Sequence, residues 1–308
     1  MSGADERFDL TSGGGGVEER VDDVARYVFF SCALVTVLTT LGIFLVLLQG
    51  SFEFFGEVSI VEFLTGTDWS PVITPRSYGV LPLVWGTLVI TIGSALVAIP
   101  IGTATAVYLS EYADPQVRNV LKPTLEVLAG IPTIVYGFFA LSFITPQLQR
   151  FFPETGTFNL AAGAIVVGIM IIPMVSSLSE DAMSSVPDDL RNAAYGLGAT
   201  KFEVSTSVVV PSALSGIVAS YILALSRAIG ETMAVTLAVG MTPQITLDLR
   251  EPGQTMTAYM VDIAISDVSA GSIGYMSLFA VGLTLFAMTL SLNLFSLWIK
   301  SRYREEYQ

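Results

Sequence analysis

The chain has 308 residues, of which 52% are hydrophobic and only 13% are charged, and its formal net charge is −13. Soluble domains usually carry about a quarter charged residues, so the composition excludes an ordinary soluble domain and indicates an integral membrane protein. The single cysteine, Cys32, and the lack of histidine exclude an internal disulfide and a histidine-ligated zinc site.

The N-terminal residues 1–25 are predicted to form a disordered, acidic, cytoplasmic tail, because they are polar and cannot bury enough apolar surface to fold. An apolar run at residues 27–48 follows. About 25 polar residues precede this run, it is longer than a signal peptide requires, and no small-residue cleavage site follows it. We therefore interpret it as a retained first helix.

Six apolar runs are long enough to span a hydrocarbon core about 30 Å thick. A transmembrane β-barrel would show alternating segments of about ten residues instead. The sequence therefore predicts an all-α, polytopic membrane protein with helices near residues 27–48, 83–109, 121–145, 160–179, 214–239 and 274–298. Four prolines in or beside these runs are expected to bend or break helices: Pro82, Pro100, Pro132 and Pro173.

Lysine and arginine in the loops predict the orientation of the chain in a plasma membrane. With the N-terminus in the cytoplasm, most basic residues outside the apolar runs are cytoplasmic. The outer loops then hold only Arg76, Arg150 and Arg250. Both termini are therefore expected in the cytoplasm.

Acidic residues are spread over the tail and the loops rather than gathered in one patch. Such a solvated acidic surface suits concentrated salt, where screening removes the repulsion between like charges. We expect a halophilic source; the alternative is an acid-rich set of loops without that meaning.

The loop at residues 180–212, called the coupling loop below, is longer than a connection requires. Proline followed by two aspartates predicts a helix start, and two glycines predict its end and a turn. A second helical segment follows, and a proline begins the next membrane helix. The residues are Pro187, Asp188, Asp189, Gly196, Gly198 and Pro211. We expect a docking knob of two short helices, the alternative being a loop that only connects.

Arg227 and Glu231 lie in the apolar run 214–239. A charge at the centre of a membrane helix costs about 2.5 to 3.5 kcal/mol on insertion scales, so such residues mark functional sites by default. Their spacing predicts that both lie on one face of a continuous helix. Gly230 between them is expected to allow another helix to approach closely. The alternative is a self-neutralising pair with no role in binding.

The coupling loop resembles the EAA loop of ABC importer permeases. In that family Glu-Ala-Ala is followed by three residues, glycine, nine residues and Ile-x-Leu-Pro. The residues that match this spacing are Asn192, Ala193, Ala194, Gly198 and Pro211. Asn192 stands where the family has glutamate, which puts a salt bridge from this position in doubt. The resemblance implies that the loop inserts into a groove of an ATP-hydrolysing subunit.

Residues 226–235, Ser-Arg-Ala-Ile-Gly-Glu-Thr-Met-Ala-Val, resemble the signature of phosphate-specific importer permeases. Gly-Glu-Thr-Met-Ala-Val is similar to the PstC-type subunit, whereas the PstA-type subunit typically has Ala-Pro after Gly-Glu-Thr. Segments 81–88, 108–112 and 126–137 agree, so the resemblance covers about residues 27 to 300.

Inorganic phosphate is anionic, so its pathway requires a positive lining. Arg227 suits this because a guanidinium binds phosphate oxygens bidentately and stays charged. The carboxylate of Glu231 is expected to compete for Arg227 and so aid release. Gly230 and Thr232 complete the substrate pathway that the resemblance implies.

The resemblance implies a MetI-like permease fold. Its parts are the tail 1–25, a first helix and extracellular loop at 26–80, a permease domain at 81–300 and a C-terminal tail at 301–308. The implied partners are a PstA-type permease, two ATP-binding subunits and an extracellular phosphate-binding protein, with no nucleic acid. The chain has no phosphate-binding loop, so ATP and Mg²⁺ are expected in the partner, and this chain is expected to be a transport subunit without a cofactor rather than an enzyme.

Two classes of alternative remain at this point. Within transporters, the chain is a PstA-type subunit or a permease for another oxyanion, such as molybdate or sulfate. In another class, it is a membrane sensor or scaffold whose coupling loop docks a regulatory protein.

Overall fold

The computed structural model describes residues 18–302, and the chain divides into two compact units, Met1–Gln49 and Gly50–Gln308. The first unit holds most of helix α1 (Glu18–Glu57). This helix begins within the stretch predicted as a tail, whose residues 1–17 lie outside the described part, as do residues 303–308. Large apolar side chains are exposed all around α1 between residues 21 and 48, as expected of a helix surrounded by lipid.

Four helices of the described chain are long and apolar enough to cross a membrane. Two further pairs of helices, each bent at a short break, are also long and apolar enough when each pair counts as one span. The described chain therefore has up to six candidate membrane spans. The four are α1, α3 (Leu81–Val107) with its π-helical continuation η1 (Tyr108–Tyr112), α7 (Leu160–Ser184) and α14 (Ile273–Arg302). The predicted all-α polytopic fold is confirmed.

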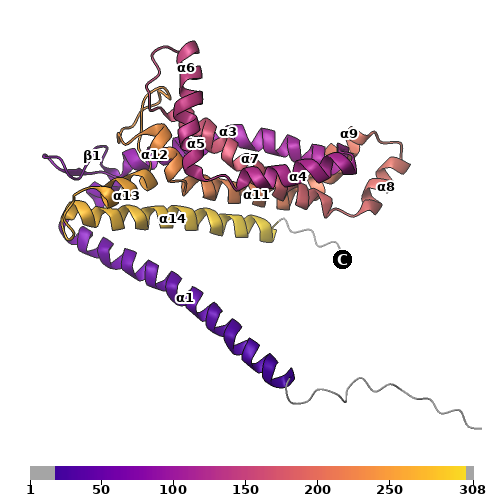
Figure 1. Ribbon diagram of the computed structural model, residues 1–308, viewed down its shortest axis with the longest axis horizontal. Helices are drawn as coiled ribbons and strands as arrows, with labels where there is room; N and C mark the ends of the chain where they lie inside the picture. The colour runs from indigo at the N-terminus through magenta and orange to yellow at the C-terminus, as the bar shows by residue number, and fades with distance from the viewer. Residues whose placement is uncertain (1–17, 303–308) are drawn as a thin grey trace, which may run out of the picture. The chain divides into compact units, whose positions relative to one another are not determined.

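In the second unit, α3, α7, α11 (Leu214–Ile229) and α14 run side by side (Figure 1). The α3–α7 contact is close because glycines face the partner helix. A Cβ atom on Gly102 would lie 2.7 Å from a methyl group of Val175, and one on Gly168 would lie 2.7 Å from Val97. Small residues of this kind allow membrane helices to approach closely.

An aromatic cluster occupies the end of this unit at which α2 (Ile60–Thr65) and α13 (Met256–Ile265) lie. A two-stranded hairpin, β1 (Trp69–Ser70) and β2 (Ser77–Tyr78), contributes two of its rings. The rings pack edge to face, the arrangement that aromatic quadrupoles favour. The buried members are Phe54, Phe63, Trp69, Tyr78 and Tyr259.

The predicted helix at 121–145 is broken. Helix α4 (Pro115–Ala129) and the following helical segment meet at 89°, and α5 (Thr133–Phe139) begins after Pro132. The π-helical segment η2 (Ala140–Ile144) and α6 (Thr145–Phe151) continue from α5. Proline lacks an N–H and disfavours helix in the residue before it, which accounts for the break.

The other three prolines do not break their helices. Pro82 lies in the first turn of α3, where a missing N–H costs nothing. Pro100 and Pro173 lie inside α3 and α7, which continue through them.

The coupling loop forms the predicted pair of short helices. Helix α8 (Asp188–Gly196) is followed by Gly198, whose φ of 87° lies in the left-handed region that glycine tolerates. Helix α9 (Lys201–Val204) begins with a capping box between Thr200 and Glu203.

The chain then continues through the π-helical segment η3 (Ser205–Val209) and α10 (Val210–Ser212). It bends by 70° before α11 begins at Leu214. Pro211 therefore lies in the short helix before the bend, and not at the start of the membrane helix as predicted.

Candidate functional site

The predicted continuous helix at 214–239 is interrupted: α11 ends at Ile229, and α12 (Met233–Val239) begins after three intervening residues. Helix α12 packs on α5, the helix that follows the other break. The close approach here is made by Gly137, where a Cβ atom would lie 2.9 Å from Leu237. At Gly230 the nearest atom to such a Cβ is the carbonyl oxygen of Ser226 in α11, 3.7 Å away, so no other helix of the described chain approaches closely there.

Arg227 lies in the last turn of α11 and is exposed. Among the side chains that the structure describes, residues 21–298, it has no hydrogen-bond or ion-pair partner. Its charge lies close enough to act on the phenol of Tyr136 in α5. That phenol donates a hydrogen bond of 2.9 Å to the carbonyl oxygen of Leu128, in the last turn of α4. Arg227 is thus an unpaired guanidinium near both helix breaks.

Glu231 has a different environment from the predicted one. Its side chain is buried, with 7% exposed, and Oε1 accepts a hydrogen bond of 3.1 Å from the backbone N–H of Ala234 in the first turn of α12. Its carbonyl oxygen accepts a bond of 2.6 Å from the hydroxyl of Thr257. The prediction that Arg227 and Glu231 pair along one helix face is therefore wrong, because the helix ends between them.

The remaining two predicted pathway residues form the break itself. Gly230 ends α11, and Thr232 is the N-cap residue of α12, with its hydroxyl donating to the carbonyl of Gly230 at 3.1 Å. Interrupted membrane helices leave backbone groups available beside transport pathways. A guanidinium at such a position can bind a planar or tetrahedral oxyanion through two parallel hydrogen bonds.

The coupling loop presents a small exposed surface on α8. Asn192 and Ala193 are exposed, and Leu197 just after the helix is 91% exposed. Ala194 is half-buried against the core beneath, and Gly198 has no atom near the position of a Cβ. Leu197 therefore offers apolar surface directly after α8, before the capped start of α9.

One arginine ties α8 to the membrane helices. Arg191 Nη2 lies 3.1 Å from Glu111 Oε1, and the Glu111 side chain is only 4% exposed. The same nitrogen donates to the carbonyl of Met183 at 2.8 Å, and Nη1 donates to the carbonyl of Val186. Arg191 also pairs with Asp188 within α8. The guanidinium thereby connects α8 with the end of η1 and the end of α7.

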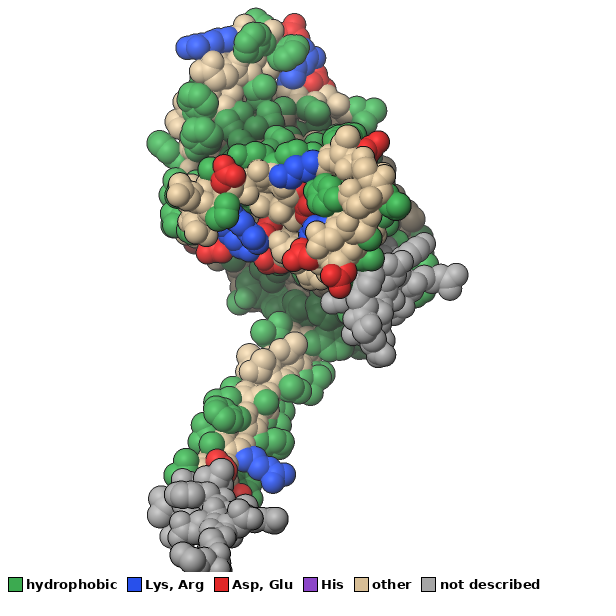
Figure 2. Space-filling model, turned by 90° about the vertical axis from the view of Figure 1, so that its right-hand side faces the viewer, with side chains coloured by type: hydrophobic (Ala, Val, Ile, Leu, Met, Phe, Trp, Pro, Cys, Tyr) green, Lys and Arg blue, Asp and Glu red, His purple; other side chains and the backbone are tan. Residues whose placement is uncertain are grey.

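A second ionic cluster ties α4 to α7. The fully buried Glu180 side chain accepts a bond of 2.6 Å from Lys122 Nζ and another from the guanidinium of Arg118. Lys122 also reaches Asp181 at 2.7 Å, and the Ser184 hydroxyl donates to Glu180. Two cations and a hydroxyl offset the cost of burying this carboxylate. Figure 2 shows charged side chains gathered at this end, with apolar side chains around them.

Sequence reasoning did not identify these two ionic connections. For the α4 cluster a signal exists: Arg118 and Lys122 are one helical turn apart, and so share a face that needs a counter-ion such as Glu180. For Arg191 and Glu111, which are 80 residues apart, no local pattern indicates the pair. The residues 21–298 contain no cluster of acidic, cysteine or histidine side chains that could hold a metal ion.

Comparisons with known proteins agree with this architecture. Residues 98–305 match the family of binding-protein-dependent transport system inner membrane components. The chain belongs to this permease family. Among its relatives, a probable ABC transporter permease of Bacillus subtilis is 34% identical over 92% of each chain. The PstC phosphate transport permease of Mesorhizobium japonicum is 34% identical over 83% of each chain.

The solved structure of a bacterial alginate ABC transporter supports the permease fold. It superposes with a TM-score of 0.63 over 91% of this chain and 96% of that one, at 16% identity. The chain is therefore a multi-pass membrane permease subunit of an ABC importer, and the family resemblance predicted from residues 180–239 is confirmed.

Proposed function

We propose that this permease is the PstC-type subunit of an importer that carries inorganic phosphate into the cell, and that Arg227 is the residue that meets the anion. Curated relatives named as phosphate permeases support the substrate. The observation that supports the role of Arg227 is that its guanidinium is exposed beside two helix breaks and has no ion-pair partner among the side chains of residues 21–298.

The proposal assigns Glu231, Gly230 and Thr232 to the frame of the pathway. Glu231 and Thr232 hold the break between α11 and α12, while Arg227 is left available for an oxyanion. A carboxylate already engaged by a backbone N–H need not compete with phosphate.

The proposal also covers the assembly. A second, PstA-type permease, two ATP-binding subunits and an extracellular phosphate-binding protein complete the importer, with ATP and Mg²⁺ bound by the ATPase. The α8 surface with Asn192, Ala193 and Leu197 contacts the ATPase, and it lies with both chain termini in the cytoplasm.

Uptake of labelled phosphate into vesicles that contain the assembled complex tests the proposal. Removing a charge-assisted hydrogen bond costs about 2 kcal/mol, so Arg227→Ala should lower uptake roughly thirtyfold. The uptake of Arg227→Lys should lie between that of the wild type and that of Arg227→Ala, since lysine keeps the charge but loses the bidentate geometry. Copurification of the ATPase should stay at the wild-type level in both variants.

Unchanged uptake in Arg227→Ala would remove Arg227 from the pathway. Sulfate or molybdate that competes better than phosphate would assign the permease to another oxyanion. An assembly in which no ATPase copurifies would favour the sensor or scaffold function over import.

A further inference from the structure

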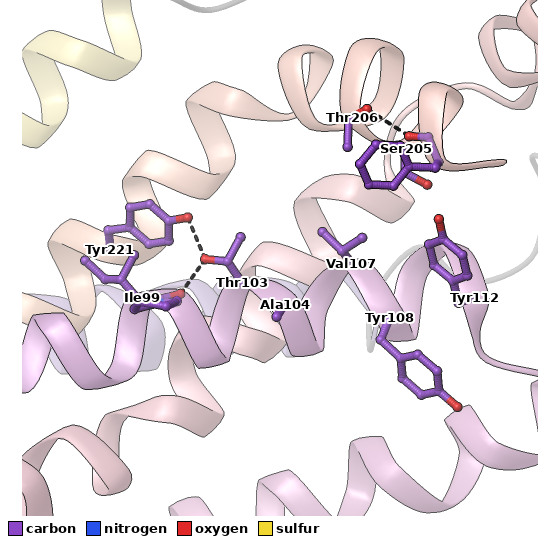
Figure 3. Close-up of a pocket in the computed structure, with 11 residues that line it drawn as sticks. Ile99, Thr103, Ala104, Val107, Tyr108, Tyr112, Ser205, Thr206 and Tyr221 are labelled. Atoms are coloured by element: carbon purple, nitrogen blue, oxygen red, sulfur yellow. Dashed lines mark hydrogen bonds between the residues drawn. The ribbon is translucent and has the colours of Figure 1, made fainter. Parts of the chain in front are cut away.

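A groove runs along the side of the second unit between α3 with η1 and the α9–η3–α11 segment (Figure 3). Its volume is about 680 Å³. One wall includes Ile99, Ala104 and Val107, and the other includes Phe202 and Tyr221. Residues 99 to 112 rise by about 20 Å at 1.5 Å per residue, which exceeds one leaflet of a core about 30 Å thick.

The two walls are fixed to each other at one end of the groove. The hydroxyl groups of Thr103 on α3 and Tyr221 on α11 lie 2.6 Å apart (Figure 3). This hydrogen bond joins α3 to α11 across the groove, so the spacing of the two walls is fixed at this end by the protein itself.

The other end of the groove is polar and aromatic. Tyr108 is 45% exposed, Tyr112 is 40% exposed and Phe202 is 68% exposed. Lys201 Nζ lies over the Tyr112 ring, 5.1 Å from its centroid, and forms no ion pair with the side chains of residues 21–298. Exposed aromatic rings beside a lysine are typical of the boundary between hydrocarbon and lipid headgroups.

We propose that this groove binds an anionic phospholipid. The acyl chain lies along the apolar walls between Ile99 and Val107, and the phosphate of the headgroup meets Lys201 beside Tyr112. The groove has apolar walls and a cation at one end. A phospholipid has the matching arrangement, with an apolar acyl chain and an anionic phosphate at one end. The site is independent of the transported substrate and of which leaflet the α8–α9 end faces.

Photolabelling of the full-length chain, purified with its copurifying subunits in phosphatidylcholine nanodiscs, tests the proposal. The probe is phosphatidylglycerol with a diazirine in its acyl chain. Label is expected on peptides with residues 99–108 and 202–206. Ala104→Trp, which fills the groove, should abolish this label. The matched control Ile101→Trp, on an exposed position of the same helix outside the groove, should leave it unchanged.

A second measurement keeps the proposal testable if a tryptophan variant fails to fold. Lys201→Gln should lower the preference for phosphatidylglycerol over phosphatidylcholine about fivefold, the effect of one lysine near an anionic headgroup. Equal labelling of the groove and of the exposed face at Ile92 and Leu96 would overturn the proposal. A wild-type groove without label would also overturn the proposal. If the Ala104→Trp complex then also lost a second permease, a protein subunit rather than a lipid would occupy the groove.

Discussion

At the scale of single residues, the two charges near the α11–α12 break have separate tasks. Arg227 keeps its guanidinium free within the described residues, whereas Glu231 is buried and accepts a backbone hydrogen bond from Ala234. A negative charge at the start of a helix is stabilised by the helix dipole. The guanidinium of Arg227 therefore stays available for a ligand, whereas the carboxylate of Glu231 stabilises the start of α12.

This division predicts different results for two substitutions of Glu231. Glutamine keeps an acceptor oxygen for Ala234, so Glu231→Gln should retain near wild-type phosphate uptake and thermal stability. Alanine removes the acceptor, and Glu231→Ala should lose about 1 kcal/mol of stability, the usual cost of a lost helix cap. Uptake assays and thermal unfolding of the purified complex measure both. Equal loss of uptake in both variants would instead make Glu231 a counter-ion of Arg227.

At the scale of elements, the sequence predicted the apolar helices and the two short helices of the coupling loop. Their signals are local: Pro187 with its aspartates begins α8, and Gly198 ends it. The interruption at Gly230 was not predicted, because glycine is common within continuous membrane helices. The side-chain contacts of Arg191 were not predicted either, because they depend on how α3 and α7 pack.

The ion pair of Arg191 and Glu111 predicts an asymmetric effect of mutation. Arg191→Gln leaves Glu111 buried without its cation, which costs about 3 kcal/mol for a pair of this kind. Glu111→Gln leaves Arg191 bonded to the carbonyls of Met183 and Val186, and should cost less. Both should lower the ratio of uptake to ATP hydrolysis, Arg191→Gln more than Glu111→Gln, because the first removes the contacts of α8 with η1 and α7 and the second removes only the contact with η1.

A double-mutant cycle and a control variant distinguish this linkage from general destabilisation. Arg191→Gln combined with Glu111→Gln should recover part of the loss, as expected of residues that interact directly. Arg150→Gln removes an exposed hydrogen bond to Gln147 and should stay within about 0.5 kcal/mol of wild type. Additive losses in the double variant would show that the pair does not act as a unit.

The loop at 240–255 has an ion pair that predicts a pH dependence. Arg250 Nη2 donates to Asp248 at 2.6 Å and holds the pKa of this carboxyl down to about 2, below its ordinary value of 3.8. Because the folded pKa is the lower one, the pair contributes its full stability above pH 3.8 and loses it as the pH falls through about 2.

Limited digestion with pepsin measures this effect. At pH 4 the loop of the wild type should be cut more slowly than that of Arg250→Gln, and near pH 2 the two rates should converge. The ratio of rates cancels the pH dependence of pepsin itself. A ratio that stays constant between the two pH values would mean that Asp248 does not control the loop.

At the scale of the whole molecule, the two ends of the second unit differ in chemistry. One end has the charged clusters around Glu180 and Arg191 and the coupling loop. The other has the aromatic cluster and the 240–255 loop, which bonds to the start of α7 through the amide of Ala161 and the carbonyl of Leu249. Helix α7 has 25 residues and is about 37 Å long, which is enough to place these ends on opposite sides of a hydrocarbon core about 30 Å thick.

The single cysteine makes this orientation directly measurable. In a Cys32→Ser background, a membrane-impermeant maleimide should label Leu247→Cys from outside intact cells, because residue 247 is 85% exposed in the 240–255 loop. Leu197→Cys, 91% exposed beside α8, should be labelled only after lysis. The Cys32→Ser parent is the control. The reverse pattern, or labelling of both on one side, would contradict the proposed topology.

The glycine contacts between α3 and α7 have a mechanical consequence. With Val175 seated against Gly102 and Val97 against Gly168, neither helix can slide past the other without a clash. We expect the two helices to move together as a rigid pair. Arg191 contacts both at the same end, through Glu111 in η1 and the carbonyl of Met183 in α7. Over about 37 Å, a tilt of the pair by about 5° would displace its far end by about 3 Å, so we expect a small displacement of α8 to move the opposite end of these helices.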